Sequence, residues 1–119
     1  MRLAIVIIAD RGIPNQERLH LRALADANLN FYAIFVTHYI SDKIATPPKS
    51  AYWFAPGMVK AGDNIVLYTG SGTPIKRPRP DGGTDHFVYW NMPGTIWNNI
   101  DDCAVLVEIT TWQTSAFGM

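Results

Sequence analysis

The residues best suited to binding chemistry form a basic cluster in the second half of the chain. Lys76, Arg77 and Arg79 alternate with Pro78 and Pro80. Proline favours extended backbone, which directs the three cationic side chains outward. Guanidinium groups bind anionic oxygens in a forked geometry. The cluster therefore suggests a contact for an anionic ligand, and the alternative is a solvated loop whose charges only maintain solubility.

Aromatic residues stand near this cluster at the ends of two apolar segments. Tyr68 ends one segment, and Tyr89 and Trp90 end the next. Because aromatic rings stack on nucleobases, these side chains together with the cations would suit a small nucleotide-type ligand. The formal net charge of the chain is zero, and this disfavours a dedicated nucleic-acid-binding domain.

Other residue combinations match no established site pattern. Residues 70–73 are glycine-rich but lack the Gly-Lys-Ser/Thr sequence and the helix start of a phosphate-binding loop. Asp81, Asp85 and His86 have the spacing of neither a zinc site nor a calcium loop, so turn-capping carboxylates are favoured. Cys103 opens an apolar segment, where a buried, inert thiol is usual. We therefore predict no catalytic residue, no metal and no cofactor.

The segments that carry these residues have the patterns of short β-strands separated by turns. Residues 17–22 alternate between leucine and polar side chains, which is typical of a half-buried strand. Residues 29–40 are apolar on both faces, which predicts a central strand or one covered on both sides. Residues 70–85 are expected to form a long loop. Strands are expected at residues 2–9, 17–22, 29–40, 52–54, 64–69, 86–90 and 103–109.

Composition indicates one globular domain over residues 1–119. Of the 119 residues, 48% are hydrophobic and 17% are charged, a balance typical of a folded domain. The zero net charge does little to prevent self-association. The single cysteine excludes an internal disulfide and favours a cytoplasmic protein. The apolar run at residues 3–9 is too short to span a membrane and is expected to be a buried strand.

Five segments follow one another in an order that is similar to a known family. They are residues 17–21, 29–35, 53–63, 65–68 and 97–106, with Trp-Asn-Asn-Ile-Asp-Asp ahead of a Val-Leu strand as the most distinctive part. Over residues 16–110 they resemble the lamin-tail domains, immunoglobulin-like β-sandwiches found in nuclear lamins and in bacterial proteins. The family pattern favours a glycine before the aspartate, where this chain has Ile100. The resemblance implies an all-β, immunoglobulin-like sandwich of about seven to nine short strands that acts as an interaction module without shared catalytic residues.

Two functional classes follow from these observations, and a third is least favoured. The leading hypothesis is a stand-alone, non-catalytic module that associates with itself or with another protein through edge strands and its aromatic tail. Trp112 and Phe117 are the expected interface residues. The alternative is a protein that binds or sequesters a small anionic ligand with residues 76–79. An enzyme with a cysteine or carboxylate site is the third.

Overall fold

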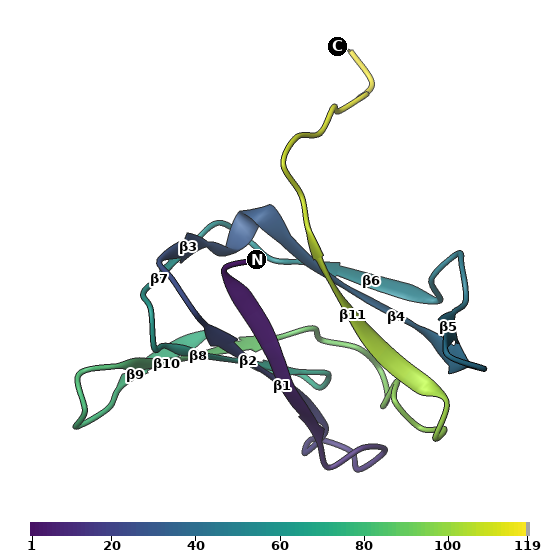
Figure 1. Cartoon of the computed structure of the whole chain (residues 1–119), viewed down its shortest axis with the longest axis horizontal. Coiled ribbons are helices and arrows are strands. Elements are labelled where there is room, and N and C mark those ends of the chain that lie inside the picture. The colour runs from purple at the N-terminus through teal and green to yellow at the C-terminus, as the bar shows by residue number, and fades with distance from the viewer. Residues whose placement is uncertain (119) are drawn as a thin grey trace.

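The computed structural model describes residues 1–118, and its regular secondary structure is almost entirely β-strand (Figure 1). Two main sheets face each other across one core, and the short 3-10 helix η1 (Leu29–Phe31) is the one helical element among the described residues. The predicted all-β sandwich is confirmed. The strands are β1 (Leu3–Ala9), β2 (Arg18–Ala23), β3 (Ala27–Asn28), β4 (Tyr32–Ile40), β5 (Lys43–Ile44), β6 (Ser50–Trp53), β7 (Met58–Val59), β8 (Asn64–Tyr68), β9 (Ile75–Pro78), β10 (Thr84–Tyr89) and β11 (Asp102–Glu108).

The first sheet contains five strands in the order β1-β2-β8-β10-β9. Neighbouring strands are antiparallel except β8 and β10, which run parallel. This exception arises because the chain passes from β8 to the outer position of β9 and then returns through β10. Period-two alternation sends Leu19 and Leu21 of β2 and Ile65 and Leu67 of β8 to one face, where all four are fully buried. That face forms one wall of the core.

The second sheet is centred on β4. This strand pairs with β11 along one edge and with β6 and β5 along the other, always antiparallel. Tyr32, Ile34 and Val36 point from β4 into the core, where they belong to the same cluster as the buried residues of the first sheet. The short strands β3 and β7 pair with each other beside η1. The prediction that residues 29–40 contain a central strand is confirmed.

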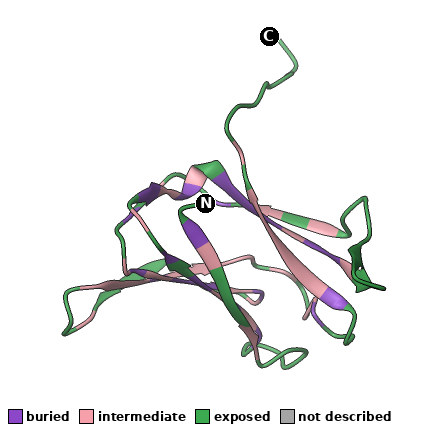
Figure 2. Cartoon of the chain, in the orientation of Figure 1, coloured by how far each residue is buried: buried purple, intermediate pink, exposed green. Residues whose placement is uncertain are grey.

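The core is closed by residues that lie outside the main strands. Trp97, in the connection between β10 and β11, is 0% exposed, and Phe54, just after β6, is 1% exposed. Figure 2 shows the buried positions along β2, β4 and β8, whereas β11 has intermediate exposure over most of its length. Burial of large apolar side chains is the main stabilising contribution in a domain of this size.

Three predicted elements differ from the structure. Residues 3–9 form a strand as expected, but the strand is not buried: β1 is an edge of the first sheet, and Ile5, Val6 and Ile7 are 40%, 60% and 56% exposed because none of the described elements covers them. The strand expected from residue 29 begins at Tyr32, because the Asn28 side chain accepts a hydrogen bond from the Asn30 backbone N–H and caps η1. The loop expected at residues 70–85 contains β9. Pro78 lies within β9, and proline is tolerated there because β9 is an edge strand with one side unpaired.

Candidate functional site

Arg79, a predicted anion-binding residue, is engaged within the chain. Its guanidinium donates to Asp85 Oδ1 at 2.7 Å, to Asp81 Oδ1 at 3.1 Å and to the Gly62 carbonyl at 2.9 Å. Burial by itself would raise the pKa of Asp85, but hydrogen bonds from Arg79 and Asn64 outweigh burial and lower the pKa. These contacts hold the turn after β9 against the start of β8. An anionic ligand at Arg79 would have to compete with two carboxylates.

Lys76 and Arg77 are neighbours on β9 and therefore point to opposite faces of the first sheet. Arg77 is in register with Asp85, and its guanidinium carbon lies 5.0 Å from the centre of the Phe87 ring on the outer face. Lys76 is in register with His86, and both residues line a cleft between the sheets. The two cations do not converge on one ligand position.

The predicted stacking residues also lie on opposite faces of the first sheet. Tyr68 and Tyr89 stack on the outer face, with ring centroids 5.3 Å apart and an interplanar angle of 14°. Gly72 lies so close to the Tyr89 ring that an added Cβ would collide with it, so the chain itself covers part of that ring. Trp90 lies on the inner side, with its ring centroid 5.4 Å from that of Tyr52. The predicted ligand residues therefore lie on both sides of the first sheet.

The predicted interface residues of the tail are accessible. Trp112 forms a T-shaped pair with Trp53, with centroids 5.0 Å apart, and a tilted pair with Phe31 at 5.9 Å. The exposed fractions of these three residues are 43%, 48% and 41%, so they form an aromatic cluster that stays open to solvent. Phe117 is fully exposed.

The outer surface of the second sheet is apolar, and the sequence analysis did not identify it as a site. Its residues alternate with the core positions of β4, β6 and β11, so they point away from the first sheet. None of them is charged. Most are exposed or partly exposed, whereas Ala33 and Thr37 are buried, and the Thr37 hydroxyl donates a hydrogen bond to the Ala45 carbonyl. We define the apolar face as Ala33, Phe35, Thr37 and Tyr39 of β4, Ala51 and Trp53 of β6, and Cys103, Val105 and Val107 of β11.

The charged group at the start of β11 points inward and is paired. Asp102 is buried, and its Oδ1 accepts a hydrogen bond from Lys49 Nζ at 2.8 Å. His38 Nδ1 lies 3.3 Å from the same oxygen but is not aligned for a hydrogen bond. Burial alone would raise the pKa of Asp102, yet Lys49 and the Asn99 N–H outweigh burial and lower it. Burial raises the pKa of Cys103 and so favours its neutral thiol on the apolar face.

Glu17 is a buried carboxylate that the sequence analysis missed. It is 0% exposed, and its Oε1 accepts hydrogen bonds from Thr69 Oγ1 at 3.0 Å and the Ile96 N–H at 2.8 Å. Its Oε2 accepts from the Gly12 N–H at 2.8 Å and the Trp97 N–H at 3.1 Å. The residue thus joins the start of β2 to the preceding turn and to two segments far away in the chain, at residue 69 and at residues 96–97. Local sequence pattern cannot distinguish it from a solvent-exposed residue at the start of an alternating strand.

Asp63 and His86 form a second buried polar pair. Asp63 accepts hydrogen bonds from the Lys60 and Thr84 backbone N–H groups, both at 3.0 Å, and lies 2.8 Å from His86 Nε2. Burial alone would raise the pKa of Asp63, but these three partners outweigh burial and lower it. The carboxylate therefore acts as the acceptor and the imidazole as the donor. Asp63 thereby stabilises its own turn, and His86 is fixed at the wall of the cleft.

Residues 1–118 contain no group of three or more His, Cys, Asp or Glu side chains placed to hold a metal ion. The same residues include no helix of the length and apolarity needed to cross a membrane. Comparison with protein-family models and with curated proteins gave no match to this chain.

Proposed function

We propose that the protein is a small, non-catalytic interaction module that self-associates by packing the apolar face of one copy against that of another. The observation that carries the proposal is the apolar face, on which three strands present no charged side chain. A contiguous exposed apolar patch of a few hundred Å² is often a functional surface of a protein. The zero net charge supports a second copy as the occupant, because the two copies would repel each other little.

Two further observations support the same class of function. Residues 16–110 resemble the lamin-tail domains, which mostly act as interaction modules. The cluster of Phe31, Trp53 and Trp112 continues the apolar face toward the C-terminal tail, where exposed aromatic rings suit an interface anchor. We place the module in the cytoplasm, since its single cysteine needs no oxidising compartment.

The dimensions of the apolar face predict a weak dimer. β11 has seven residues, which span about 24 Å, and three adjacent strands span about 14 Å. The projected area is therefore roughly 340 Å², less than half of the ~800 Å² that each partner contributes to an interface of standard size. The aromatic cluster adds area at one end. We expect a dissociation constant in the micromolar range, on the order of 10–100 μM.

Sedimentation velocity over a concentration series tests the proposal. The wild-type chain is expected to shift from monomer to dimer between roughly 5 and 500 μM. Val105→Lys places a charge in the middle of the apolar face, opposite Phe35. In the monomer the lysine reaches solvent, but in the dimer it would be buried without a partner, so association should weaken at least tenfold.

A matched lysine substitution in the other exposed apolar segment serves as the control. Val6 lies in the edge strand β1 and is 60% exposed. Val6→Lys should leave the dimer intact, because β1 belongs to the first sheet. A wild-type chain that stays monomeric throughout, or a dimer that is lost in Val6→Lys but kept in Val105→Lys, would refute the proposed interface.

A further inference from the structure

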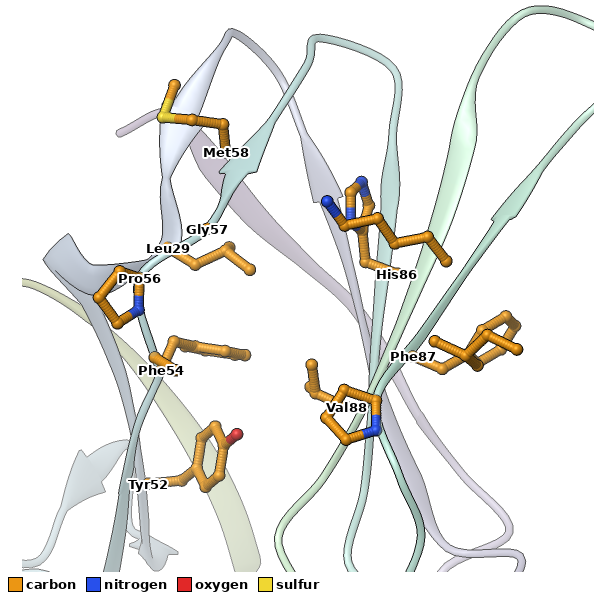
Figure 3. A pocket seen from close by; sticks show the side chains of 13 residues that line it. Leu29, Tyr52, Phe54, Pro56, Gly57, Met58, His86, Phe87 and Val88 are labelled. Atoms are coloured by element: carbon orange, nitrogen blue, oxygen red, sulfur yellow. The ribbon is translucent and has the colours of Figure 1, made fainter.

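A cleft opens between the two sheets on the side of β9 and β10 (Figure 3). One wall comes from the segment around β6 and β7, with Tyr52, Phe54 and Pro56, and the other comes from β10, with His86 and Val88. The volume is about 280 Å³, which corresponds to roughly nine water molecules. The cleft therefore has room for a ligand of about ten non-hydrogen atoms.

The walls of the cleft are firmly positioned before any ligand binds. Tyr52 and Phe54 form a T-shaped pair with centroids 5.0 Å apart, and Trp90 supports Tyr52 from the core side. On the opposite wall, the buried Asp63 carboxylate holds the His86 ring through a 2.8 Å contact. Rigid apolar walls reduce the entropy that a ligand has to lose on binding.

Lys76 gives this apolar cleft a single positive charge. It lines the cleft from β9, and it takes part in none of the ion pairs formed within residues 1–118. None of the described residues that line the cleft is acidic. An ammonium group beside apolar walls is complementary to a molecule with an apolar body and one negative charge.

We propose that the cleft binds a small amphipathic carboxylate, a short alkyl chain or a single ring system bearing one carboxylate group. The apolar body lies between Phe54, Pro56 and Val88, and the carboxylate meets the Lys76 ammonium. The opposing explanation is that Lys76 only protects an edge strand, since inward-pointing charges discourage strand pairing between molecules. The two explanations differ in whether Lys76 selects the charged form of a ligand.

Octanoate and 1-octanol are suitable probes, because they share a chain length and differ in charge. We expect octanoate to shift the amide NMR signals of residues 52–55, 57, 58, 75, 76 and 86–88, and to bind about tenfold more tightly than 1-octanol. Lys76→Gln should weaken octanoate binding about tenfold and leave 1-octanol binding unchanged. Lys43→Gln, in the exposed strand β5, is the matched control and should change neither.

A second variant tests the apolar walls. Val88→Phe fills the cleft and should abolish the shifts caused by both probes. If Val88→Phe does not fold, the Lys76→Gln result alone decides whether the cleft binds the carboxylate. The proposal is overturned if octanoate causes no shifts at millimolar concentration, if Lys76→Gln binds it as well as wild type, or if the shifts appear on β4 and β11 instead. These results are independent of dimer formation, because the cleft and the apolar face lie on opposite sides of the second sheet.

Discussion

Replacement of Glu17 by glutamine should destabilise the protein strongly, although the two side chains have almost the same shape. The carboxylate accepts four hydrogen bonds, two from the buried residues Thr69 and Trp97, one from the half-buried Ile96 and one from the Gly12 N–H. A glutamine amide has only one oxygen, so its NH2 group must face two of these donors. In the better orientation it faces the Thr69 hydroxyl, which can rotate to accept, and the Ile96 N–H, which cannot.

The size of the effect follows from this geometry. One buried N–H group without an acceptor costs about 1–3 kcal/mol, and the two bonds kept by the amide oxygen lose their charge assistance at about 1 kcal/mol each. The smaller desolvation penalty of a neutral side chain offsets part of this loss. We expect Glu17→Gln to lower the free energy of unfolding by about 3 kcal/mol and Tm by roughly 10 °C.

Urea unfolding followed by tryptophan fluorescence measures this loss, since Trp97 is buried beside the carboxylate. Glu108→Gln is the matched control, because Glu108 is exposed and accepts its hydrogen bond from the Tyr32 hydroxyl at 2.6 Å. Its unfolding midpoint should fall much less. Equal midpoints for the two glutamine variants would show that the Glu17 network contributes no more than an exposed hydrogen bond.

Three further predictions concern acidity, reactivity and packing. Because the pKa of Asp102 is lowered in the folded chain, its ionised form adds stability above the ordinary aspartate pKa of about 3.9, and that stability disappears as the pH falls through the folded-state pKa. The urea unfolding midpoint of the wild-type chain should therefore fall more between about pH 6 and about pH 3 than that of Asp102→Asn. Partial burial raises the pKa of Cys103, so iodoacetamide should label it several-fold more slowly than glutathione at about pH 8, and equal rates would contradict this partial burial. Gly72→Ala should lower Tm by about 3–5 °C because its Cβ meets the Tyr89 ring, whereas Gly94→Ala, whose Cβ meets open space, should leave Tm unchanged in differential scanning fluorimetry.

Apolar segments between turn residues, with strict alternation at residues 17–22, were sufficient to predict seven of the eleven strands in residues 1–118, and the two-residue strands β3, β5 and β7 were not predicted. Residues 17–22 and 64–69 lie within one residue of β2 and β8: the first range was found from its alternating leucines and the second from a short apolar run after a turn. β9 was not predicted, since the prolines at 74, 78 and 80 are typical of loops and the edge position that tolerates one of them depends on the whole sheet.

The binding residues were less predictable for a related reason. Lys76 and Arg77 were grouped because they are adjacent in the sequence, but adjacency on a strand sends them to opposite faces. The apolar character of both faces of residues 29–40 was visible in the sequence. Which face remains open depends on where the first sheet packs, and this is decided by contacts far apart in the chain. The hydrogen-bond network of Glu17 cannot be recognised from the neighbouring sequence for the same reason.

The parallel pairing of β8 with β10 has a consequence for the order of folding. β10 occupies the position between β8 and β9, although it follows both in the chain. The turn between β9 and β10 is short and is held by the Arg79 and Asp81 side chains and by the Gly82 N–H, which donates to the Arg79 carbonyl at 3.1 Å. We expect this hairpin to form first and to dock on β8 as one unit. During synthesis on the ribosome, the edge of β8 that pairs with β10 would therefore stay unpaired until residues 84–89 have emerged.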